Sequence, residues 1–126
     1  DIANDPGQVE NFLRMEQWIF DSPDNPGEMF RQFSNWLYKK NRLKNGTLTI
    51  DGKPVDLKKV SMPLLNIYAT QDHIVPPESS TCLDQLVGSS DYSTHAVPSG
   101  HIGIYVSSKS KDLPVKIAEW IKKRDS

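Results

Sequence analysis

The sequence predicts an α/β fold in which parallel strands are flanked by helices. Three observations support this prediction: a nearly continuous apolar run at 64–69, a helical pattern opened by two prolines at 76–77, and a second strand pattern at 91–97. A strand, a helix and a strand joined by short links within about 30 residues form a βαβ unit. Because such a crossover makes the two strands parallel neighbours, they are expected to lie side by side in one sheet.

The elements of this unit begin and end at suitable residues. Pro63 is tolerated because it stands at the first position of the strand. The apolar run that follows suits a strand covered on both faces. Pro76 and Pro77 favour a helix start, and Gly88 favours its end. A final amphipathic helix is predicted over 113–123, with basic residues in its last turn as the helix dipole favours.

The first part of the chain predicts two aromatic-rich helices. Apolar residues recur at spacings of three and four over 8–20 and again over about 26–41, and the turn cluster DSPDNPG separates the two patterns. Two interpretations remain open: the aromatic side chains form a core, or the helix pair forms a wall over a hydrophobic active site.

A short hairpin is predicted between these helices and the βαβ unit. The stretch TLTIDGKPV at 47–55 has alternating β-favouring residues around Asp51-Gly52, which is a strong hairpin-turn signal. We therefore expect a helical cap-like segment with a hairpin over 1–59, and a βαβα core over 60–126.

Composition excludes several functional classes. Fifteen basic against sixteen acidic residues give a net charge of −1, which argues against nucleic acid or an anionic membrane surface as a partner. No run of 18 apolar residues exists, so we expect no membrane span. The single cysteine, Cys82, cannot form an internal disulfide, which suits a reducing compartment. The chain starts without Met and with a polar stretch, so we expect it to be part of a longer protein.

Asp72 and His101 are the candidate catalytic residues. Each follows the carboxyl end of a predicted strand, so both are expected at the same edge of the sheet, where open α/β folds place their sites. A histidine base needs one ring nitrogen held by an acceptor, and an ionised Asp supplies that acceptor. We expect Gly100 to let the backbone turn sharply before His101. The alternative is that Asp72 only caps the turn before Pro76.

The other residues of these types are interpreted as structural. His73 is expected at the surface or in a supporting position, and His95 stands in mid-strand. Three histidines without clustered Cys/His spacing predict no metal site. Cys82 is expected on the buried side of a helix, where a thiol in apolar surroundings is unreactive, so we do not assign it as a nucleophile.

Three segments resemble a known family: MEQWIFDSPDNPGEMFRQF, MPLLNIYATQDHIVPPESS and VPSGHIGIYVSSK. They resemble the carboxyl-terminal half of polyhydroxyalkanoate synthases, and the resemblance extends over roughly 10–120. It is strongest to the catalytic subunit of the class III enzymes and nearly as strong to the class IV enzymes. The resemblance implies an α/β-hydrolase fold that joins 3-hydroxyacyl units from coenzyme A thioesters into polyester. It matches Asp72 of QDHIVPP to the acid, and His101 of SGHIG to the base, of a Cys-His-Asp triad.

The nucleophile of that family is absent from this chain. It is a cysteine in a G-x-C-x-G elbow that precedes the acid, because chain order in this fold is nucleophile, acid, histidine. No such elbow occurs here, so the amino-terminal half is expected to be missing and the chain to be inactive alone. Two alternatives remain: part of a serine esterase or lipase-like hydrolase, and a non-catalytic module that self-associates through an exposed strand edge and apolar surface.

The resemblance also implies partners and location. We expect hydroxyacyl-CoA and the growing polyester chain as ligands, no resident cofactor, and a second synthase subunit in the full-length enzyme. The expected location is the cytoplasm, at the surface of polyester granules.

Overall fold

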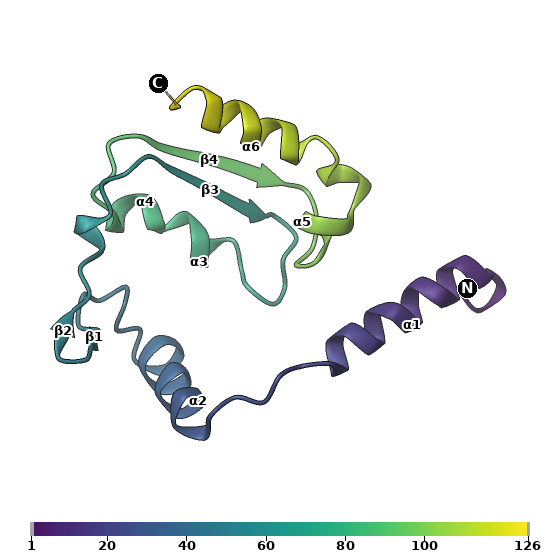
Figure 1. Cartoon of the computed structure of the whole chain (residues 1–126), viewed down its shortest axis with the longest axis horizontal. Helices are drawn as coiled ribbons and strands as arrows, with labels where there is room; N and C mark the ends of the chain where they lie inside the picture. The colour runs from purple at the N-terminus through teal and green to yellow at the C-terminus, as the bar shows by residue number, and fades with distance from the viewer. Residues whose placement is uncertain (1, 126) are drawn as a thin grey trace. The chain divides into compact units, whose positions relative to one another are not determined.

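The computed structural model describes residues 2–125, and the chain forms two compact units, Asp1–Asn41 and Arg42–Ser126. The first unit contains a short 3-10 turn, α1 (Pro6–Phe20) and α2 (Gly27–Phe33), and α2 continues into a π-helical segment, Ser34–Lys39 (Figure 1). Both predicted helices are therefore present.

Local capping explains where these helices begin and end. The Asp5 carboxylate accepts hydrogen bonds from the backbone N–H groups of Gly7 and Gln8, at 2.9 and 3.3 Å, and Pro6 occupies the first helical position. The second helical stretch ends at Lys39, and two residues later Asn41 has a φ of 50°, a left-handed conformation that asparagine tolerates.

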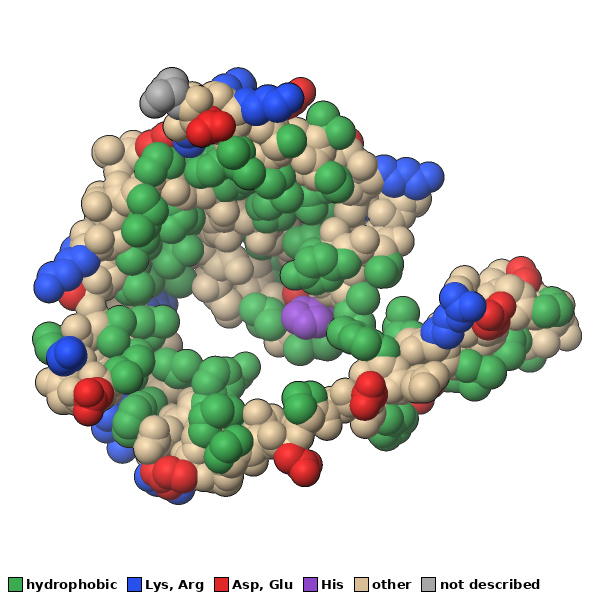
Figure 2. Space-filling model, in the orientation of Figure 1, with side chains coloured by type: hydrophobic (Ala, Val, Ile, Leu, Met, Phe, Trp, Pro, Cys, Tyr) green, Lys and Arg blue, Asp and Glu red, His purple; other side chains and the backbone are tan. Residues whose placement is uncertain are grey.

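The apolar faces of these helices are open to solvent. Neither α1 nor α2 has a buried residue; Trp18 is 65% exposed and Phe20 is 81% exposed. Figure 2 shows hydrophobic side chains at the surface of this unit. Within this unit the two helices do not bury these side chains, and the choice between a core and a wall over an active site stays a prediction.

The second unit begins with the predicted hairpin. β1 (Thr49–Ile50) pairs antiparallel with β2 (Lys53–Pro54). Asp51 and Gly52 both have positive φ, 50° and 70°, as the tight turn that matches strand twist requires. The hairpin lies within the compact unit that starts at Arg42. The functional division expected at residue 59 stays a prediction.

The βαβα arrangement is confirmed. β3 (Leu64–Ala69) and β4 (Tyr92–Val97) pair in parallel over six residue pairs. The crossover carries α3 (Glu78–Thr81) and α4 (Leu83–Leu86) on one side of the strand pair, and α6 (Leu113–Lys122) lies on the other (Figure 1).

Side-chain hydrogen bonds attach these helices to the strands. Asn66 Nδ2 donates to the Ser80 carbonyl at 2.9 Å, which joins β3 to α3. Trp120 Nε1 donates to Ser93 Oγ at 3.3 Å, which joins α6 to β4. The buried hydrophobic side chains among the described residues include Ala69 and Val97, the last residues of the two strands. The carboxyl edge of the sheet therefore stands on the best-packed part of the unit.

The structure differs from the sequence prediction in the crossover helix and in the stretch after His101. The helix predicted over 76–88 is divided at Cys82. Gly88 follows the helix as expected, but its main constraint is distant in sequence: a Cβ there would lie 2.0 Å from the Lys58 carbonyl oxygen. The stretch after His101, treated as a loop, contains α5 (Gly103–Val106) and a 3-10 turn, Ser108–Ser110. None of the helices in 2–125 is long and apolar enough to cross a bilayer.

Candidate active site

Two loops at the carboxyl edge of β3 and β4 carry Asp72 and His101. Backbone pairing continues into these loops beyond the strands: Thr70 N–H donates to the Val97 carbonyl at 2.9 Å, and Gln71 N–H donates to the Ser99 carbonyl at 3.0 Å. The second of these bonds immediately precedes Asp72. The loops are thus tied together by main chain at the point where the candidate residues emerge.

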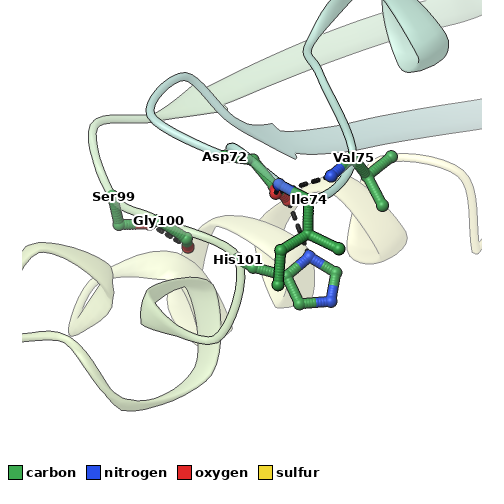
Figure 3. Close-up of polar contacts among 6 residues, drawn as sticks. All are labelled: Asp72, Ile74, Val75, Ser99, Gly100 and His101. Carbon is green, nitrogen blue, oxygen red and sulfur yellow. Dashed lines mark hydrogen bonds and ion pairs between the residues drawn. The ribbon is translucent and has the colours of Figure 1, made fainter.

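The two candidate side chains are in direct contact. His101 Nδ1 lies 2.8 Å from Asp72 Oδ2 (Figure 3). The other carboxylate oxygen, Oδ1, accepts the backbone N–H groups of Ile74 at 2.9 Å and Val75 at 2.8 Å. The two interpretations of Asp72 are therefore compatible, since one oxygen caps the turn while the other holds the imidazole. The catalytic assignment of the pair stays a prediction.

The protonation of the pair follows from these contacts. Burial, with only 10% of the Asp72 side chain exposed, acts to raise the pKa of its carboxyl. The hydrogen bonds from Val75, His101 and Ile74 outweigh this effect, so the pKa of Asp72 lies below its ordinary value. An ionised carboxylate only accepts hydrogen bonds, so Nδ1 of His101 carries the proton in this pair.

The outer nitrogen of His101 is then available for chemistry. With Nδ1 protonated and the ring neutral, Nε2 has a free lone pair, and 45% of the side chain is exposed. A base with one nitrogen fixed and the other open is the arrangement that activates a hydroxyl or thiol nucleophile.

The His101 loop is held by small residues. Ser110 is buried and its Oγ donates to the Gly103 carbonyl at 2.7 Å. A Cβ at Gly103 would lie 2.9 Å from the Ser99 Cβ, so α5 packs closely on the end of β4. The chain bends at Pro98 and Ser99 and turns again at His101 and Ile102, but Gly100 does not adopt a conformation that only glycine favours. Its φ is not left-handed, and a Cβ there would make only an ordinary 3.6 Å contact with the Gln71 carbonyl.

The remaining candidates lie outside the acid–base contact. His73 is exposed and His95 is half-buried in β4. Cys82 is half-buried rather than buried, at the junction of α3 and α4, and its Sγ approaches the Ser79 carbonyl of its own helical turn at 3.7 Å. Within 2–125 no three His, Cys, Asp or Glu side chains are grouped as a metal ion would require.

Sequence reasoning missed Ile74 and Val75 as part of the site. Their backbone N–H groups fix the Asp72 carboxylate, although their side chains carry no chemistry. The available signal was the Asp followed by a turn before Pro76, which is typical of a carboxylate bonded to backbone two and three residues further on.

The fold is that of a large family defined by its parallel sheet and flanking helices. The model of the alpha/beta hydrolase fold family matches residues 2–108, and the chain belongs to that family. The predicted fold class is therefore confirmed.

Several relatives of this chain are polymerase subunits. The chain is 51% identical to a poly(3-hydroxyalkanoate) polymerase subunit of Allochromatium vinosum over 98% of this chain and 35% of the relative. It is 51% identical to the subunit of the same name from Thiocystis violacea, with the same coverage. The identity is 49% to that of Synechocystis sp., over 98% of this chain and 33% of the relative. The resemblance to polyhydroxyalkanoate synthases is confirmed, and the chain spans about a third of these relatives' length.

Proposed function

We propose that this chain supplies the acid and base of a Cys-His-Asp triad to a polyhydroxyalkanoate synthase. The observation that carries the proposal is the 2.8 Å contact between His101 Nδ1 and Asp72 Oδ2 at the carboxyl edge of two parallel strands. The names of the relatives give the substrate class, a 3-hydroxyacyl unit.

His101 moves the protons of the proposed reaction. Its Nε2 takes the proton of a cysteine thiol that lies outside this chain, and the thiolate attacks the carbonyl carbon of the hydroxyacyl-CoA thioester. The coenzyme A thiolate leaves and receives that proton. His101 then takes the proton of the incoming hydroxyl as that oxygen attacks the carbonyl carbon of the acyl-enzyme. The ester bond forms as the thioester bond to the cysteine breaks, and the cysteine thiolate leaves and takes the proton back from His101.

Asp72 supports both proton transfers without reacting. Its carboxylate, kept ionised by three hydrogen bonds, holds Nδ1–H in place and stabilises the imidazolium that forms in each step. Because two of these bonds come from backbone, the acceptor stays fixed while the ring changes charge.

The decisive test is release of coenzyme A from 3-hydroxybutyryl-CoA by the complete protein that contains residues 1–126. We expect turnover with polymer formation, and a cysteine in the elbow that precedes the acid in chain order. A serine there, together with hydrolysis of simple esters and no polymer, would establish an esterase instead.

The isolated chain of 126 residues is expected to release no coenzyme A, because it lacks the nucleophile. Its solvent-open apolar helices and two-stranded sheet also favour self-association. Light scattering of the purified chain tests this, and a monomer that persists on dilution would contradict it. A second synthase subunit, the cytoplasm and the granule surface remain the proposed partner and location of the complete protein.

A further inference from the structure

Two aliphatic side chains are exposed directly beside the acid–base pair. Ile74 is 73% exposed and Val75 is 40% exposed. Their backbone N–H groups both donate to Asp72 Oδ1, so the carboxylate that holds His101 also fixes the turn that presents them. In Figure 3 the Ile74 side chain extends from this turn in the direction of the His101 ring.

The residue types are unusual for their position. An exposed turn is ordinarily built from glycine, asparagine, aspartate or serine, whose side chains suit the backbone and the solvent. Here the chain places two β-branched aliphatic residues two and three positions after the acid. A large apolar side chain held at the surface contributes little to folding until another apolar group covers it.

The loop on the other side of the pair shows the same feature. α5 follows His101, and its Tyr105 and Val106 are 85% and 70% exposed. Both loops at this edge therefore carry an exposed apolar pair within five residues of the candidate catalytic side chain. This repetition distinguishes the edge from an isolated exposed apolar residue, which needs no explanation.

We propose that Ile74, supported by Val75, is the contact for the aliphatic part of the acyl group and determines the acyl length that the enzyme accepts. The inference rests on the proposed function, since it names the part of the substrate that this surface binds. A 3-hydroxyacyl group carries its aliphatic side group on the carbon that lies two bonds from the reacting carbonyl carbon. An apolar side chain beside the base is therefore within reach of that group while the carbonyl is attacked.

The test compares substrates of increasing length in the complete protein. The kcat/KM for 3-hydroxybutyryl-, 3-hydroxyvaleryl- and 3-hydroxyhexanoyl-CoA is measured for the wild type and for Ile74→Ala. Replacing isoleucine by alanine makes room beside the base. The kcat/KM for 3-hydroxyhexanoyl-CoA divided by that for 3-hydroxybutyryl-CoA is therefore expected to rise by about 10-fold. Ile74→Leu, which keeps the apolar volume, is expected to leave the ratio within about 2-fold of the wild type.

The matched control is Ile50→Ala. Ile50 lies on β1 of the hairpin and is 59% exposed, so the same atoms are removed from an exposed isoleucine outside the site. Its ratio of kcat/KM values is expected to equal that of the wild type. An unchanged ratio in Ile74→Ala would overturn the inference. A lower melting temperature with that unchanged ratio would indicate that protein, rather than substrate, covers Ile74.

Two further outcomes are also decisive. If Ile74→Ala does not fold, Ile74→Val replaces it, with a smaller rise of about 3-fold in the ratio expected, and no rise overturns the inference. If the wild type cleaves p-nitrophenyl esters but no thioesters, the proposed function fails, and the inference is judged on esters of the same acyl lengths. If the wild type cleaves neither, both fail together.

Discussion

The two ends of the β3–β4 pair each carry a carboxylate, and the two are used differently. At the carboxyl end Asp72 divides its oxygens between two backbone N–H groups and His101. At the amino end Asp91, which directly precedes β4, gives both oxygens to the guanidinium of Arg124, at 2.6 Å each. Arg124 also stacks on Trp120, with 4.0 Å from its central carbon to the ring centroid.

The two contacts differ in what they leave open. Each of the three guanidinium nitrogens of Arg124 donates a hydrogen bond, since NH1 also donates to the Trp120 carbonyl at 2.9 Å. The Asp91–Arg124 pair thus joins the carboxyl end of α6 to the sheet and leaves no group for chemistry. His101, in contrast, has one nitrogen held by Asp72 and the other open. The open group therefore lies at the carboxyl end of the strands, the end at which open α/β sheets bind their ligands.

The largest expected effect is on kcat, from substitutions at the carboxyl end of the β3–β4 pair. In the complete protein, His101→Gln is expected to reduce kcat by about 10⁴-fold, and Asp72→Asn by about 10³- to 10⁴-fold, because the base or its fixed tautomer is lost. Coenzyme A release from 3-hydroxybutyryl-CoA is the measurement. Activity of Asp72→Asn within a factor of two of the wild type would show that the carboxylate only caps its turn.

Substitutions at the amino end of the β3–β4 pair are expected to lower stability and to leave kcat nearly unchanged. Arg124→Leu removes both hydrogen bonds to Asp91 and the stacking on Trp120, so the melting temperature of the complete protein should fall by a few degrees. Calorimetry and the coenzyme A assay on the same sample test this. A large loss of kcat at an unchanged melting temperature would contradict the separation of the two ends.

Acid is expected to weaken both carboxylate contacts. The Arg124 hydrogen bonds lower the pKa of Asp91 against an opposing effect of burial. At Asp72 burial raises the pKa, but the hydrogen bonds from Val75, His101 and Ile74 together lower it below its ordinary value. A pKa that is lower in the folded state stabilises the fold above the ordinary carboxyl pKa of about 4, and this contribution is lost as pH falls through the folded value. Melting temperatures measured from pH 7 to pH 3 should therefore fall, and Asp91→Asn and Asp72→Asn should each make the fall less steep.

The smallest effect is expected at Trp120. Trp120→Phe keeps an aromatic face for Arg124 but removes the donor to Ser93 Oγ, so the free energy of unfolding should decrease by about 1 kcal/mol. Chemical denaturation of the wild type and the variant measures it. Ser93→Ala, which removes only the acceptor, is the matched variant and should give a similar loss.

The sequence predicted the strand pair and the meeting of Asp72 with His101, because both depend on local patterns. Apolar runs locate β3 and β4, and a crossover between parallel strands brings their carboxyl ends together. The break at Cys82 was not predictable in this way. The Ser80 carbonyl before it is bound by Asn66 Nδ2 of β3, a contact between residues 14 positions apart that no local pattern contains.

The close packing around individual glycines could not be predicted from the sequence either. Gly103 was not expected to matter, and Gly100 was, because a sequence shows where glycine occurs but not which backbone approaches it. The exposure of the apolar faces of α1 and α2 was not predictable for the same reason. Their periodicity correctly predicts helices with an apolar face, but it does not say what covers that face.

The backbone pairing that continues past β3 and β4 has a mechanical consequence. Because Gln71 N–H is bonded to the Ser99 carbonyl, the loops that carry acid and base cannot separate without breaking main-chain hydrogen bonds. Twisting or bending of the sheet then displaces Asp72 and His101 together and leaves their separation nearly constant. The pair behaves as one rigid unit, so in the proposed triad the distance that remains to be adjusted is the one from Nε2 of His101 to the nucleophile.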